Sequence, residues 1–126
     1  MVDATDFDIL AHLTCPLRYI NGKYRMGITL ERYERIINTI LEKIIKKGIA
    51  LEVNTSSYDR MNSSMPDEDI LRKYYSMGGR LITLGSDAHI AQNASNNFKA
   101  AIEMLKSIGF DRMYYYQKRT PKEIEI

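Results

Sequence analysis

The sequence contains one cysteine, no tryptophan, three prolines and no long apolar run. A single cysteine, Cys15, cannot form a disulfide within the chain, which favours a reducing compartment, and we expect the cytoplasm. No apolar segment approaches the roughly 20 residues needed to cross a bilayer, and the acidic start MVDATDFDIL is unlike a signal peptide. The formal net charge of +2 is too small to indicate nucleic acid or a membrane surface as a partner.

The composition is that of one soluble globular domain. The chain has 126 residues, of which 44% are hydrophobic and 27% are charged. A chain of this length can bury roughly two-thirds of its unfolded surface, so a core of useful size is possible. No low-complexity segment or linker divides it.

Strand and helix patterns alternate along the chain. Short aliphatic runs predict strands at 7–13, 49–54, 80–85 and within 111–117, and the alternating end at 122–126 is typical of an edge strand. Between them, spacing of three and four predicts helices at 29–47, 66–79 and 94–108. We expect Thr29 to cap the first helix, Pro66 to begin the second, and Gly48 and Gly109 to end the first and third.

This order predicts an α/β fold with right-handed crossovers and parallel strands. The carboxyl ends of parallel strands meet at one edge, where ligands bind in such folds. The loops expected at that edge are long, about 15 residues after the first strand and about 11 after the second, whereas the opposite turns are tight. Polar residues expected at this edge follow all four strands: His12, Arg18, Asn54, Arg60, Asp87, His89 and Arg119.

Each of these signals has an ordinary structural explanation when taken alone. A histidine in an apolar strand, as at His12, is more often structural than a ligand. Asp87 and His89, in the segment LITLGSDAHIAQN, could form a polar turn. Because both histidines of the chain and this aspartate are expected at one edge, however, we interpret them together as ligands for zinc, manganese or iron.

Three further features favour structural roles. Cys15 precedes Pro16 in an expected loop and is interpreted as a packing residue. Glu52 shares a strand face with Asn54 and is expected to pair with a neighbouring arginine or lysine. The tyrosines at 114–116 are good strand formers and need no binding role.

With these residues in place, the chain resembles the polymerase and histidinol phosphatase (PHP) superfamily, and in particular the C-terminal half of its histidinol-phosphate phosphatases. Four segments carry the resemblance, and they extend over nearly all of residues 1–126: DILAHL, ALEVNTSSYDR, MGGRLITLGSDAH and FKAAIEMLKSIGFDRMYYYQKRTPKEIEI.

The resemblance implies about half of a distorted (β/α)7 TIM-like barrel that hydrolyses phosphate monoesters with divalent metal ions. It implies that His12, Asp87 and His89 are metal ligands, that Asp87 and His89 are catalytic, and that Arg60 and Arg119 bind the substrate phosphate. In that family the three ligands belong to different ions, so the isolated chain is expected to hold metal weakly.

The chain also departs from the family pattern. The His-x-His motif of the family's opening strand and a following histidine are absent, and the chain has only two histidines. The family's bridging glutamate is absent as well. Four strands cannot close a seven-stranded barrel, and an open strand edge favours pairing with another chain. We therefore expect a fragment, a truncated product, or a half that works as a homo-oligomer or with a complementary N-terminal half.

Two functional hypotheses remain open. In the first, the chain is part of an enzyme, either a histidinol-phosphatase of histidine biosynthesis or a phosphoesterase for another phosphate ester. In the second, it is a degenerate non-catalytic half with a structural or oligomerisation role. An in-frame His-x-His encoded upstream of Met1 would favour the enzyme.

Overall fold

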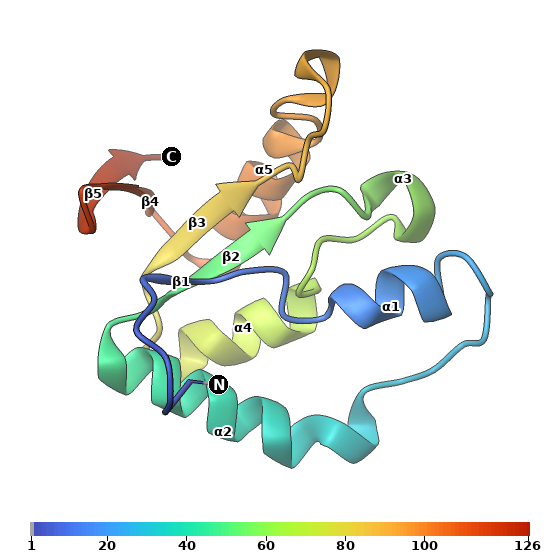
Figure 1. The fold of residues 1–126 in the computed structure, drawn as a ribbon, viewed down its shortest axis with the longest axis horizontal. Coiled ribbons are helices and arrows are strands. Elements are labelled where there is room, and N and C mark those ends of the chain that lie inside the picture. The colour runs from blue at the N-terminus through green and yellow to red at the C-terminus, as the bar shows by residue number, and fades with distance from the viewer. Residues whose placement is uncertain (1) are drawn as a thin grey trace.

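The computed structural model describes residues 2–126 and places three short parallel strands in one sheet (Figure 1). The strands lie in the order β1 (Ile9–Leu10), β2 (Ala50–Asn54) and β3 (Ile82–Gly85). Leu51 is the register partner of Leu10 on one side and of Ile82 on the other. The predicted α/β class with parallel strands is therefore confirmed for these three strands.

Helix α2 (Glu34–Lys47) follows the predicted pattern except at its start. Thr29 does not cap it, because a short 3-10 turn, η1 (Glu31–Tyr33), precedes the regular helix. The helix ends as predicted at Gly48, whose φ of 66° lies in the left-handed region that glycine adopts without strain.

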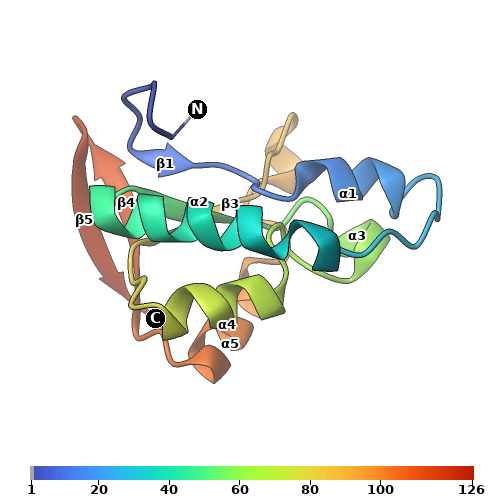
Figure 2. The same cartoon turned by 90° about the horizontal axis from the view of Figure 1, so that it is seen from below.

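The other two predicted helices are also present, with later starts. Helix α4 (Glu68–Ser76) is capped by Asp67, whose carboxylate accepts a hydrogen bond from the Ile70 amide at 3.1 Å, so Pro66 lies outside it. Helix α5 (Phe98–Ile108) begins four residues after the predicted start and ends at Gly109 as expected. Figure 2 shows α4 and α5 on the same side of the sheet, with α2 in front of the strands.

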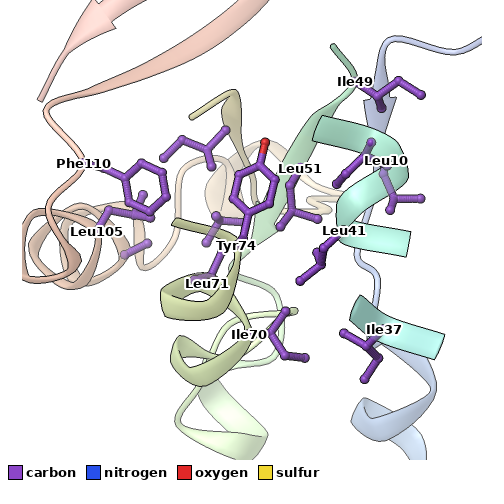
Figure 3. Packing of buried hydrophobic residues seen from close by; sticks show 14 of the residues in the cluster. Leu10, Ile37, Leu41, Ile49, Leu51, Ile70, Leu71, Tyr74, Leu105 and Phe110 are labelled. Carbon is purple, nitrogen blue, oxygen red and sulfur yellow. The ribbon is translucent and has the colours of Figure 1, made fainter. Parts of the chain in front are cut away.

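The core lies between the sheet and these helices, where Leu41, Leu51, Leu71 and Leu105 are fully buried (Figure 3). Tyr74 is also buried, and its hydroxyl donates to the Leu81 carbonyl at 3.0 Å. No helix of residues 2–126 is long and apolar enough to span a membrane.

The first predicted strand, 7–13, is much shorter than expected. Only Ile9 and Leu10 pair with β2, and the chain then turns into α1 (Cys15–Ile20), which was not predicted. Pro16 lies in the first turn of α1, where its missing amide proton is not needed. Cys15 is thus a half-buried first helical residue and not a loop residue.

The predicted parallel pairing of the fourth strand is wrong. β4 (Arg112–Gln117) pairs antiparallel with β5 (Thr120–Glu125), forming a separate two-stranded sheet. The two residues between them, Lys118 and Arg119, have φ of 49° and 64°. Two consecutive left-handed residues form the tight turn whose twist suits a hairpin, so the chain folds back on itself instead of joining β3.

One face of α2 is incompletely covered. Ile36 is 60% exposed and borders a groove of about 330 Å³. Val2, Leu10, Leu13 and Ile40 supply further apolar lining. The groove lies beside β1, one of the two edge strands of the sheet.

Candidate functional site

His12 lies at the carboxyl edge of the sheet, two residues after β1. Its backbone amide donates to Glu52 Oε2 at 2.8 Å, and its carbonyl accepts from the Cys15 amide at 2.8 Å. The residue is exposed and has a φ of 33°. The turn that carries His12 is therefore fixed at both backbone groups, while its imidazole faces solvent.

Asp87 lies at the same edge, two residues after β3, and has a φ of 49°. Its Oδ2 accepts a hydrogen bond from Arg18 Nη1 at 3.2 Å, in an ion pair whose aspartate side chain is 40% exposed. The Nε2 atom of His89 is 4.0 Å from Asp87 Oδ1, and its side chain is 90% exposed. The structure thus brings Asp87 and His89 together.

Both His12 and Asp87 occupy left-handed backbone conformations. Such a conformation costs a residue other than glycine roughly 1–3 kcal/mol, and it persists only where surrounding contacts fix it. At His12 the contact is Glu52, and at Asp87 it is Arg18. Other turns of the chain, such as the one at Lys118 and Arg119, have the same backbone conformation, so it does not by itself distinguish a ligand from a turn residue.

The arginines divide between the two edges of the sheet. Arg18, in α1, contacts the carboxyl edge through Asp87 and also donates to Ser56 Oγ at 3.1 Å. Arg60 lies in the four-residue helix α3 (Tyr58–Met61) within the loop after β2. It is exposed, and we find no hydrogen bond or ion pair of its side chain within residues 2–126.

Arg119 lies at the opposite edge from the one predicted. Its guanidinium bonds to the carboxylates of Asp6 at 2.7 and 2.8 Å and of Asp8 at 3.0–3.3 Å. Asp8 precedes β1 at the amino end of the sheet, and its carbonyl accepts from the Ala50 amide. Arg119 lies there because β4 is not a parallel strand of the β1–β3 sheet, so the turn after β4 does not come to the carboxyl edge of that sheet. The same contacts hold the pKa of Asp6 below its usual value.

Three residues connect His12 with Asp87: Asn54, which was expected at this edge, and Glu52 and Ser56, which were not predicted as part of the site. Glu52 does not pair with an arginine or lysine as expected: its Oε2 accepts from the His12 amide and from Asn54 Nδ2, at 3.2 Å. Asn54 in turn accepts from the hydroxyl of Ser56. The alternation of Glu52 and Asn54 on one strand face signalled that they are neighbours, but not what they bind.

The donor chemistry suits a divalent ion, whereas the donor number does not. Imidazole and carboxylate are ordinary ligands for zinc, and a structural or catalytic site needs three or four of them. Within residues 2–126, no group of three or more His, Cys, Asp or Glu side chains is close enough to hold an ion. The described residues therefore do not form a complete metal site by themselves.

Comparisons with known proteins point in one direction. The chain is 32% identical over 111 residues to a Thermotoga maritima protein named "Probable histidinol-phosphatase", covering 88% of this chain and 45% of that protein. A Clostridium acetobutylicum protein of the same name is 30% identical over 116 residues, covering 91% and 44% respectively. This chain is related to the histidinol-phosphatases. It spans slightly less than half the length of these relatives.

A solved structure agrees with the sequence relatives. The crystal structure of a histidinol phosphate phosphatase from Lactococcus lactis, in complex with zinc, L-histidinol and phosphate, matches with a TM-score of 0.60 and 25% identity. The match covers 75% of this chain and 36% of that one. No protein-family model matches the chain. The resemblance to the C-terminal half of a histidinol-phosphatase is thereby confirmed.

Proposed function

We propose that this chain is the C-terminal half, residues 1–126, of a metal-dependent phosphoesterase of the histidinol-phosphate phosphatase type. The supporting observation is the position of Asp87 at the carboxyl edge of a parallel sheet, between His89 and the guanidinium of Arg18. The names of the relatives favour histidinol phosphate over other phosphate esters as the substrate, and the single cysteine favours the cytoplasm as the compartment.

His12, Asp87 and His89 would contribute ligands to divalent ions, for which zinc, manganese and iron are the candidates. Such an ion, when bound, activates a water molecule and neutralises charge on the phosphoryl oxygens. Arg60 would bind the substrate phosphate, because its guanidinium is exposed and presents paired donors to phosphate oxygens. Arg119 is left out of this proposal because Asp6 and Asp8 already occupy its guanidinium at the other edge.

The remaining ligands would come from a second polypeptide segment that also completes a TIM-like barrel. β1 is an edge strand of the sheet, and the apolar groove beside it has room for an additional packing element. A complementary N-terminal half or a second copy of this chain would fit that position. The partial match to the Lactococcus lactis structure supports this architecture.

The test is complementation. The chain is mixed with the remaining N-terminal part of the Thermotoga maritima relative, and phosphate release from histidinol phosphate is measured with added zinc or manganese. We expect negligible turnover by the chain alone and turnover by the mixture. Asp87→Ala and His89→Ala should each lower that turnover by orders of magnitude, because each removes a ligand.

Three matched variants serve as controls. Lys47→Ala removes a contact to the Val2 carbonyl far from the ligand edge, Cys15→Ala shortens a half-buried thiol, and Arg119→Ala opens the pair with Asp6 and Asp8. All three should leave turnover nearly unchanged. A mixture that retains full activity with Asp87→Ala would show that Asp-x-His is a polar turn.

The second candidate function is a non-catalytic half whose role is packing or oligomerisation. It is favoured by the absence of a three-donor cluster within residues 2–126 and by the exposed apolar face of α2. A mixture that binds the N-terminal half tightly but releases no phosphate would favour this candidate.

A further inference from the structure

Asn54 is buried at the carboxyl end of β2, where both ends of its side-chain amide are bonded. Only 1% of the residue is exposed. Its backbone amide donates to the Met65 carbonyl at 3.0 Å, and its carbonyl accepts from the Met65 amide at 2.9 Å. These two bonds fix the backbone that carries the Asn54 side chain. A buried amide whose nitrogen and oxygen are both hydrogen-bonded is a rigid connector.

The amide nitrogen of Asn54 connects to the His12 turn. Nδ2 donates to Glu52 Oε2 at 3.2 Å, and the same oxygen accepts from the His12 backbone amide at 2.8 Å. The Glu52 carboxylate is therefore held between a side chain of β2 and the turn after β1.

The amide oxygen of Asn54 connects to the Asp87 turn. Oδ1 accepts from the backbone amide of Ser56 at 3.0 Å and from its hydroxyl at 2.6 Å. The hydroxyl oxygen accepts from Arg18 Nη1 at 3.1 Å, and the same Nη1 donates to Asp87 Oδ2 at 3.2 Å. All donors in this series point the same way, from the cationic Arg18 toward the anionic Glu52.

We propose that Asn54 is a positioning residue that links the His12 turn to the Asp87 turn and so sets the relative placement of two candidate ligands. The inference rests on the proposed function for the use of that placement. The hydrogen-bonded connection itself can be tested without metal or substrate.

The hydrogen bonds on the Glu52 side of Asn54 and those on its Ser56 side can be removed by different substitutions. Asn54→Asp keeps the acceptor for Ser56 but replaces the donor to Glu52 with a second carboxylate oxygen, which repels it. Ser56→Ala keeps the backbone amide bond to Asn54 but removes the hydroxyl that accepts from Arg18. Ser56→Thr restores that hydroxyl and is the matched control.

Hydrogen exchange in the full 126-residue chain measures the His12 side. With ¹⁵N-labelled histidine only two backbone amides are observed, because the chain has two histidines. Asn54→Asp should speed exchange at the His12 amide by about tenfold or more, since a hydrogen bond to a charged group is lost, and should leave His89 unchanged. Ser56→Ala should leave the His12 amide as in the wild type.

The bond between Ser56 and Arg18 is followed through the NMR signal of the Arg18 Nε–H group. The Nε atom is buried and has no hydrogen-bond partner among the described residues. Because burial should slow its exchange with water, we expect this signal in the wild type; it should disappear in Ser56→Ala and remain in Ser56→Thr. If Asn54→Asp does not fold, the Ser56 pair decides alone. Unchanged His12 exchange in a folded Asn54→Asp variant, or an Arg18 signal indifferent to the Ser56 hydroxyl, would overturn the proposal.

Turnover by the complemented mixture links the connection to the reaction. Asn54→Asp and Ser56→Ala should each reduce it by roughly 10- to 100-fold, as loss of an outer partner of a ligand does, and Ser56→Thr should recover it. Full turnover with both variants would overturn the positioning role. A mixture that is inactive with the wild-type chain contradicts the proposed function instead and leaves the exchange result standing.

Discussion

Replacing Gly85 with alanine should destabilise the protein because Glu52 occupies the space where a Cβ atom would lie. A Cβ built at Gly85 overlaps Glu52 Oε1 and would be 2.8 Å from its Cδ. Gly85 has no positive φ, so the backbone itself accepts alanine. The Glu52 carboxylate would have to move, and its bonds to the His12 amide and to Asn54 would be lost.

The expected magnitude follows from two opposing effects. Adding a methyl group to a filled site costs about 1–3 kcal/mol. Alanine in place of glycine in a strand gains about 0.5–1 kcal/mol, because the unfolded chain loses less entropy. Gly85→Ala should therefore lower the free energy of unfolding by about 1 kcal/mol in the wild-type chain, the middle of a range of about 0–2.5 kcal/mol.

The matched background is Glu52→Ala, which removes the overlapping atoms. There, Gly85→Ala should be stabilising by about 0.5–1 kcal/mol, because only the entropic gain remains. Urea unfolding followed by far-UV circular dichroism on the four chains of this double-mutant cycle measures the coupling, which should be about 1–3 kcal/mol. If Gly85→Ala costs as much without Glu52 as with it, the close approach of these residues is not what constrains Gly85.

Two further predictions concern pH and assembly. Burial raises the pKa of Tyr74 from 10.0 to about 12, so the folded state favours the neutral phenol. This contribution to the free energy of unfolding is complete below pH 10 and is lost as the pH rises from 10 toward 12. The urea midpoint should therefore fall less steeply with pH in Tyr74→Phe than in the wild type across that range. Parallel curves for the two proteins would contradict the prediction. Light scattering at micromolar concentration should give the wild-type chain a mass above the 14.6 kDa of one chain. Ile36→Lys should lower that mass, because Ile36 is 60% exposed beside the edge strand β1. A wild-type monomer would count against self-association.

The periodicity of apolar residues predicted the helices and central strands well because local and tertiary preferences agree there. In α2, Ile37, Leu41 and Ile44 are buried as the spacing indicates. The same pattern could not show that Ile36 is left exposed, since periodicity reports which residues are apolar and not what covers them.

The errors have identifiable physical causes. Residues 7–13 are aliphatic enough for a long strand, yet Glu52 draws the His12 amide into a turn and ends the pairing after Leu10. The fourth strand was assigned correctly, but its partner depended on the left-handed turn at Lys118 and Arg119. A Lys-Arg pair does not predict such a turn, whereas Asn-Gly does.

The candidate site was predicted in part. Asp87 and His89 follow a strand directly, so their placement needed only local information. Arg18 was expected merely in a loop, because its contact with Asp87 spans 69 residues and arises only when β1 and β3 both flank β2.

The ion pairs of Arg119 with Asp6 and Asp8 join segments that are more than 100 residues apart in the chain. All of these groups are exposed or partly exposed, and β5 is exposed along its whole length. Such pairs are screened by salt, whereas the buried contacts of β2 and β3 are not. The Arg119 ion pairs are therefore the salt-sensitive part of the hairpin's attachment, whereas Met113 also packs against the core. Rising ionic strength should loosen the contact between the hairpin and the start of the chain while the parallel sheet stays folded.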